Sequence, residues 1–94
     1  MTESRYRSKL RICYDILNTI EEEGGETGPT RILYKANLSH NRLMRYLKEL
    51  EAKNLVEKKQ VDGRTCYRLT RKGRMFLRDF AKIEEFLNSF GFTI

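Results

Sequence analysis

Residues 30–69 hold the pattern that most restricts how this chain can fold. A short segment of helical periodicity, a tight turn, a longer basic segment and a charged hairpin follow one another there without interruption. Asn37-Leu38-Ser39 is predicted to be the turn, and Ser39 is a good N-cap for the helix that follows. Asp62-Gly63 is a strong signal for a two-residue hairpin turn. The predicted order is therefore helix, turn, helix and β-hairpin.

Apolar side chains at helical spacing define the two helices of this unit. The first helix is predicted over residues 31–36, with Thr30 as its N-cap and with Ile32 and Leu33 turned toward the core. The second is predicted to follow Ser39 and to end near residue 53, because leucines recur along it at steps of four and three residues. These leucines are Leu43, Leu47 and Leu50. The opposite face of the second helix is polar and is expected to meet solvent or a ligand.

A further amphipathic helix is predicted before this unit, over residues 4–23. Its apolar positions, which lie mostly three or four residues apart, are Tyr6, Leu10, Cys13, Ile16, Leu17 and Ile20. Gly24-Gly25 is predicted to end this helix, because glycine readily adopts the left-handed conformation of a helix terminus. We interpret this helix as scaffold.

After the hairpin, Thr70 is predicted to cap a last helix over residues 71–90. An apolar seam with a 4-3-4-3 spacing follows this helix, as in a short coiled coil. Its members are Phe76, Phe80, Ile83, Leu87 and Phe90. One small domain cannot cover a helix of this length, so the seam favours dimerisation with a second copy. Packing of the seam against the same chain is the alternative.

Positive charge is concentrated in residues 30–74, from the helix-turn-helix to the start of the last helix. The formal net charge is +6. Residues 30–74 carry thirteen Lys or Arg against four Asp or Glu, whereas residues 1–29 carry four against six and residues 75–94 two against three. This segregation is the electrostatic footprint of a nucleic-acid site. A solvated basic surface is the alternative interpretation.

The hairpin completes the predicted fold. Asn54 tolerates the left-handed conformation that ends a helix, and residues 55–61 and 64–69 are predicted to be the two strands. The expected fold class is α+β and mainly helical: a winged helix-turn-helix with a β-hairpin wing and a long C-terminal helix. Residues 1–70 are predicted to form the DNA-binding domain, and residues 71–94 the C-terminal dimerisation helix.

The N-terminal half of a recognition helix reaches the base edges of the major groove. The polar side chains expected there are Ser39, His40, Asn41, Arg42 and Arg45, and Lys48 follows on the same polar face as a further DNA-binding residue. Asn41 suits bidentate pairing with adenine, and Arg42 or Arg45 suits bidentate pairing with guanine. For each arginine the alternative is a contact with phosphate, which is the more frequent kind of protein–DNA contact. The side chains expected at the sugar-phosphate backbone are Arg31, Lys58, Lys59 and Arg64. For Arg31, a surface ion pair is the alternative.

The sequence indicates no other chemistry. It shows no phosphate-binding glycine loop, nucleophile arrangement or pair of catalytic carboxylates, so we expect no enzymatic activity, catalytic residue or cofactor. His40 is the only histidine and has no Cys or carboxylate cluster at ligand spacing, so no metal site is expected.

Cys13 and Cys66 are interpreted as buried free thiols, with a disulfide or an intermolecular bridge as the alternative. No apolar run is long enough to span a bilayer and no signal peptide is recognisable, which predicts a cytoplasmic protein without a membrane partner.

Several of these residues also carry a resemblance to a known family. The segment from Thr30 to Ser39, the leucines of the second helix with Tyr46 and Leu55, and the segment from Tyr67 to Gly73 resemble small archaeal winged-helix DNA-binding proteins of the "ten-a" chromatin-protein type. The resemblance extends over nearly the whole chain. It implies a nucleoid-associated homodimer that binds double-stranded DNA, joined by an antiparallel coiled coil of the C-terminal helices. The last helix here is shorter than a long coiled-coil arm.

The sequence leaves open which role a DNA-binding dimer would have. A transcriptional regulator and an architectural chromatin protein would use the same residues, the first with strong sequence preference and the second with affinity set mainly by salt. A winged helix that mediates protein–protein interaction is the alternative from another class. RNA binding is less favoured, because Tyr67 is the only aromatic residue of the hairpin.

Overall fold

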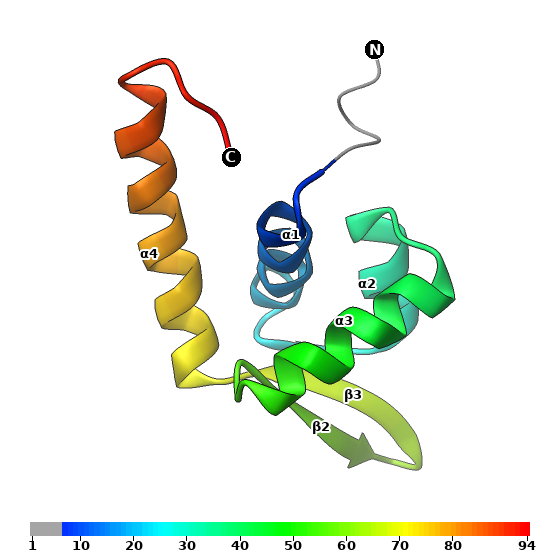
Figure 1. Cartoon of the computed structure of the whole chain (residues 1–94). Helices are drawn as coiled ribbons and strands as arrows, with labels where there is room; N and C mark the ends of the chain where they lie inside the picture. The colour runs from blue at the N-terminus through cyan, green and yellow to red at the C-terminus, as the bar shows by residue number, and fades with distance from the viewer. Residues whose placement is uncertain (1–6) are drawn as a thin grey trace.

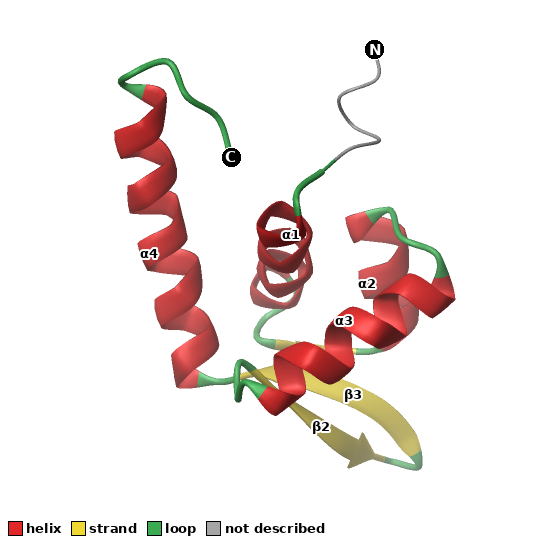
Figure 2. Ribbon diagram, viewed as in Figure 1, coloured by secondary structure: helices red, strands yellow, loops and turns green. Residues whose placement is uncertain are grey.

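The computed structural model describes residues 7–94, which form four helices and three strands (Figure 1). In chain order the elements are α1 (Lys9–Glu22), β1 (Glu26–Thr27), α2 (Pro29–Ala36), α3 (His40–Ala52), β2 (Val56–Val61), β3 (Arg64–Leu69) and α4 (Arg71–Asn88). The helix-turn-helix is α2 and α3, and the wing is the hairpin of β2 and β3 (Figure 2). The predicted fold class, a mainly helical winged helix-turn-helix, is confirmed.

α1 forms the centre of the core. Its Ile16, Leu17 and Ile20 are fully buried, and α1 lies between α4 on one side and α2 with α3 on the other (Figure 1). The three leucines predicted on the inner face of α3 are each no more than 1% exposed. The prediction for Leu10 was wrong: it is 54% exposed, because on the first turn of α1 it lies at the edge of a hollow beside α4 and not in the core, whereas Ile12 is buried. Tyr6 lies outside the described residues.

Three helix boundaries differ from the prediction. α1 begins at Lys9 instead of residue 4, and its N-cap is Ser8, whose hydroxyl accepts from the backbone N–H of Arg11 at 3.0 Å. α2 begins at Pro29 with Gly28 as N-cap, so Thr30 is not the cap. Proline is favoured at the first helical position because its missing N–H is not needed there. α4 ends at Asn88, which leaves Phe90 of the predicted seam beyond the helix.

The sheet has a strand that was not predicted. Its order is β1-β3-β2, with all neighbours antiparallel, and β1 pairs Glu26 with Arg68. A two-residue strand is too short to show alternation in sequence, so it forms only because β3 offers it an edge. The hairpin turn is confirmed: Asp62 and Gly63 have φ of 52° and 77°, the pair of positive values that a type I′ turn requires.

Gly73 sets how α4 leaves the sheet. The hydroxyl of Thr70 accepts from the Gly73 N–H at 3.0 Å, which confirms Thr70 as N-cap. A Cβ at position 73 would collide with the carbonyl oxygen of Leu55 and would lie 2.7 Å from Cδ1 of Leu69. Glycine therefore allows the first turn of α4 to lie directly on the backbone that enters the wing.

The two cysteines differ in their surroundings. Both thiols are free. Cys13 is buried in the core, and burial, assisted by the nearby Glu49 carboxylate, raises the pKa of its thiol. Cys66 was predicted to be buried, but it is only half-buried because it lies on the face of β3 opposite to the buried Tyr67.

Candidate nucleic-acid interface

The exposed side of α3 collects the polar side chains that the sequence singled out. Ser39 caps the helix and accepts from the backbone N–H of Arg42 at 3.3 Å, which starts α3 at His40. Because the three leucines point inward, the helix turns its opposite face to solvent. The exposed residues are Ser39, His40, Asn41, Arg42, Arg45 and Lys48. All six predicted positions are therefore available on the surface of one helix and its cap.

The wing does not bring its three predicted cations to one face. In an antiparallel hairpin successive side chains point to opposite faces. Lys58 lies opposite Tyr67 in the register, on the side of the sheet that carries the core, whereas Lys59 lies opposite Cys66 on the other side. Arg64, two residues before Cys66, shares the side of Lys59. Lys58 and Arg64 are exposed, and Lys59 is half-buried.

The end of α1 neutralises the cations of α2. Arg31 Nε lies 3.5 Å from Glu23 Oε1, and Lys35 Nζ lies 3.5 Å from Glu22 Oε1. On the α4 side, Arg74 Nε lies 3.7 Å from Glu21 Oε1. The ion pair that was the alternative for Arg31 is thus present in the structure. The Arg31 side chain is nevertheless 62% exposed and accessible to a ligand, so its contact with phosphate remains a prediction.

Most cations of α3 and of the wing have no such partner, although Arg68 of β3 lies 3.0 Å from Glu26. Among residues 7–94, several Lys and Arg side chains have no carboxylate oxygen within ion-pair distance. On α3 and in the wing they are Arg42, Arg45, Lys48, Lys58, Lys59 and Arg64; on α4 they are Arg71, Lys72, Arg78 and Lys82. Uncompensated positive charge is therefore present on α3 and on both sides of the wing, and also along α4.

A hollow of about 290 Å³ lies beside α3 and is lined by Lys9, Arg42, Arg45, Tyr46 and Glu49. Glu49 Oε2 lies 2.8 Å from Lys9 Nζ and 3.3 Å from the Nζ of Lys53. Hydrogen bonds from the two ammonium groups, that of Lys9 first, lower the pKa of Glu49, and the same carboxylate raises the pKa of Lys9. Sequence reasoning missed Lys9, because only the packing of α1 against α3 brings it here.

The predicted apolar seam of α4 is divided between core and surface. Phe80 is 6% exposed and its ring stacks on Tyr14 of α1 with centroids 4.6 Å apart. Phe76 packs against the hydrophobic core of its own chain, and Leu87 is half-buried. Ile83 and Phe90 are 53% and 65% exposed. The inner half of the seam thus packs on its own chain, which was the alternative, and the outer half has no cover.

Other large apolar side chains are exposed near this outer half. Phe86 is 62% exposed and its ring meets Phe90 edge to face, with centroids 5.2 Å apart. Sequence reasoning missed Phe86 because it lies between the a and d positions of the seam. Met75 and Phe92 are also exposed. An apolar hollow of about 240 Å³ lies between Leu10, Ile83 and neighbouring side chains of α4.

Within residues 7–94, no group of three or more His, Cys, Asp or Glu side chains is arranged to hold a metal ion. No helix in that part of the chain combines the length and apolar character needed to cross a membrane.

Comparison with known proteins gives one family match. The model of a family described as winged helix-turn-helix matches residues 6–88. A search of curated proteins gives no match.

Several solved structures are similar. Sso10a-2, a DNA-binding protein from Sulfolobus solfataricus, is 30% identical with a TM-score of 0.74, over 88% of this chain and 87% of that chain. A putative transcriptional regulator from Pseudomonas aeruginosa is 26% identical with a TM-score of 0.72, over 93% of this chain and 61% of that one. The transcriptional regulator BldR from Sulfolobus solfataricus shares the fold, at 20% identity and a TM-score of 0.67, over 82% of this chain and 60% of its own.

Proposed function

Since this chain belongs to the winged helix-turn-helix family, we propose that it binds double-stranded DNA as a homodimer, with α3 in the major groove and the wing on the sugar-phosphate backbone. The observation that carries the proposal is the uncompensated positive charge on α3 and the wing, on a fold in which these are the elements that meet DNA. The similarity to Sso10a-2, a DNA-binding protein, supports the same conclusion and the predicted archaeal type.

Individual roles follow from position on α3. Asn41, Arg42 and Arg45 are exposed beyond the N-cap, where side chains reach base edges. One good bidentate pair discriminates between bases by about 1 to 3 kcal/mol. Lys48 and the wing cations Lys58, Lys59 and Arg64 are assigned to phosphates, which position the protein without reading sequence. A DNA partner of this kind places the protein at the nucleoid in the cytoplasm.

The homodimer is proposed through residues 71–94, with residues 1–70 as the DNA-binding domain. The support is the row of uncovered apolar side chains on and after α4, which a second copy would remove from water. Phe80 is buried against Tyr14 of its own chain and is not available to a second copy. The contact with a partner is therefore assigned to Ile83, Phe86 and Phe90.

We expect the double substitution Ile83→Glu with Phe86→Glu to give monomers that remain folded, as measured by sedimentation and circular dichroism. Both side chains are more than half exposed, so two charges there would disrupt an interface without entering the core. The matched control is Arg78→Glu, which lowers the net charge by the same two units at an exposed position of α4 outside the apolar row. A dimer that persists in the first variant would assign the interface elsewhere.

We expect Glu49→Gln to tighten DNA binding and to steepen its dependence on salt. Glu49 forms ion pairs with Lys53 and with Lys9, which lines the same hollow as the two arginines of α3, so its removal frees two ammonium groups for phosphates. Each additional phosphate contact adds about 0.9 to the slope of log affinity against log salt. The control is Glu57→Gln, an exposed wing carboxylate that forms no ion pair among residues 7–94. Unchanged salt dependence in the Glu49 variant would exclude Lys9 and Lys53 from the interface.

The experiment that tests the proposal is a fluorescence-anisotropy titration of the wild type against random and selected duplexes at about 50 and 200 mM salt. Salt-sensitive binding with a large preference for one sequence would identify a transcriptional regulator. Salt-sensitive binding without preference would identify an architectural chromatin protein. Absence of binding at both salt concentrations would overturn the proposal and favour the protein-interaction alternative.

A further inference from the structure

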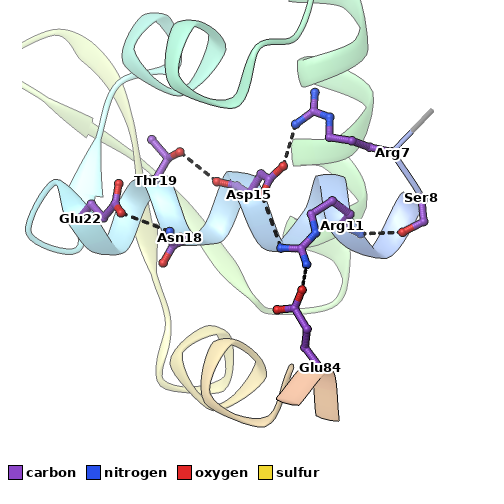
Figure 3. Close-up of polar contacts among 8 residues, drawn as sticks. All are labelled: Arg7, Ser8, Arg11, Asp15, Asn18, Thr19, Glu22 and Glu84. Carbon is purple, nitrogen blue, oxygen red and sulfur yellow. Dashed lines mark hydrogen bonds and ion pairs between the residues drawn. The ribbon is translucent and has the colours of Figure 1, made fainter. Parts of the chain in front are cut away.

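Arg7 connects α1 to the turn of the helix-turn-helix. Its guanidinium donates from Nη1 to Asp15 Oδ2 at 2.7 Å (Figure 3) and from Nη2 to the backbone carbonyl of Asn37 at 3.0 Å. Asn37 is the C-cap of α2, with a φ of 56°, and it begins the turn that leads to Ser39. The Arg7 side chain is 19% exposed, which limits competition from water. The segment before α1 thus holds the turn that precedes the recognition helix.

Asp15 shares its carboxylate with a second arginine. Arg11 Nη1 lies 3.9 Å from Asp15 Oδ1, and the Nη2 of Arg11 donates to Glu84 of α4 (Figure 3). The Arg11 guanidinium also lies over the rings of Tyr14 and Phe80, 5.1 and 5.2 Å from their centroids. The four charged side chains are between 19% and 29% exposed. They form a chain of alternating charge from α4, across α1, to the turn between α2 and α3.

This chain of ion pairs links α4 to the helix-turn-helix across α1. α4 packs against α1 and β3, and it stands across α1 from α2 and α3 (Figure 1). We propose that Arg7 is a positioning residue: by holding the turn between α2 and α3, with Asp15 as its anchor, it fixes the orientation of α3 relative to α4. The inference rests on the proposed function, because two copies joined through α4 must present their α3 helices at a set separation. If the turn is released, ordering α3 on DNA costs binding free energy.

Charge alone predicts the opposite result. Asp15→Asn removes the anchor and raises the net charge by one, which increases attraction to phosphates. Glu22→Gln is the matched control, since Glu22 is also an α1 carboxylate in an ion pair, 3.5 Å from Lys35 Nζ, but lies outside the chain of ion pairs. Arg7→Lys keeps the net charge, but its compact ammonium cannot reproduce the two-pronged geometry that serves Asp15 and the Asn37 carbonyl together.

The test is an anisotropy titration of the wild type and the three variants against one duplex at fixed salt, with hydrogen exchange of the Leu38 amide, which donates to the Leu33 carbonyl at 3.1 Å. We expect Asp15→Asn and Arg7→Lys to bind about 3- to 30-fold more weakly and to exchange this amide faster, while circular dichroism shows them folded. Glu22→Gln is expected to bind at least as tightly as the wild type.

Equal or tighter binding by both Asp15→Asn and Arg7→Lys would overturn the inference and leave the proposed function intact. If Asp15→Asn fails to fold, Arg7→Lys alone decides the outcome. A wild type that binds no duplex would overturn the proposed function, and the positioning role of Arg7 with it.

Discussion

A protein in which Arg42 and Arg45 are both replaced by alanine is expected to bind duplex DNA at least roughly 30-fold more weakly than the wild type at about 50 mM salt. A well-placed arginine contributes about 1 to 3 kcal/mol, so the loss of two exceeds about 2 kcal/mol. Both side chains are exposed and have no carboxylate partner among residues 7–94, so the substitution leaves no buried charge unpaired. Fluorescence anisotropy measures the effect.

The matched control is Arg78→Ala with Lys82→Ala, which removes the same charge from the exposed side of α4. If Arg42 and Arg45 contact phosphates, the salt slope falls by about 1 for each of them. If they contact bases, the affinity for a selected sequence falls more than the affinity for random DNA. Equal affinity of the wild type and the Arg42/Arg45 variant at low salt would show that α3 is not the recognition helix.

Gly73→Ala is expected to destabilise the protein by about 1 to 3 kcal/mol, although alanine is the better helix former by about 1 kcal/mol. The reason is steric: the added Cβ would collide with the carbonyl oxygen of Leu55, and backbone cannot yield as the end of a side chain can. For a domain of this size, each kcal/mol corresponds to a fall of about 4 to 8 °C in Tm. Thermal unfolding by circular dichroism measures the shift.

Gly28→Ser is the control for this experiment. A Cβ at position 28 would lie 3.7 Å from the carbonyl oxygen of Thr65, an ordinary contact, and the residue is the N-cap of α2 without a side-chain hydrogen bond. Serine there is expected to leave the Tm unchanged or to raise it slightly, since a capping hydroxyl is a few tenths of a kcal/mol better than glycine. A Gly73→Ala protein as stable as the wild type would contradict the close approach of α4 to Leu55.

The features that could be predicted from sequence depend on residues close together in the chain. The leucines of α3, the caps Ser39 and Thr70, and the Asp62-Gly63 turn all act within a few residues, and the structure confirms each of them. The exposed position of Arg42 and its neighbours on α3 followed from the same periodicity. Their contacts with DNA stay a prediction, because the periodicity shows which face is polar and not what binds it.

The features that could not be predicted depend on tertiary contacts. β1 exists because β3 offers an edge, and Lys9 approaches the arginines of α3 only because α1 packs beside it. The heptad spacing of α4 did not distinguish Phe80, which stacks on Tyr14, from Ile83, which remains exposed. Such differences are set by which neighbour is present on each side of a helix, and spacing within one segment carries no information about that neighbour.

The ion pairs at the end of α1 affect the molecule as a whole. Exposed pairs of this kind contribute little to the free energy of unfolding, so the role of Glu21, Glu22 and Glu23 is not mainly stability. They cancel the charge of Arg31 and Lys35 on α2 and of Arg74 on α4, whereas Arg42, Arg45 and Lys48 of α3 have no carboxylate partner among residues 7–94. Within the helix-turn-helix, positive potential is therefore concentrated on α3 and lowered on α2. For the proposed DNA complex, this means that an approaching polyanion is attracted to α3 more strongly than to α2, so that more encounters begin with α3 already facing the duplex.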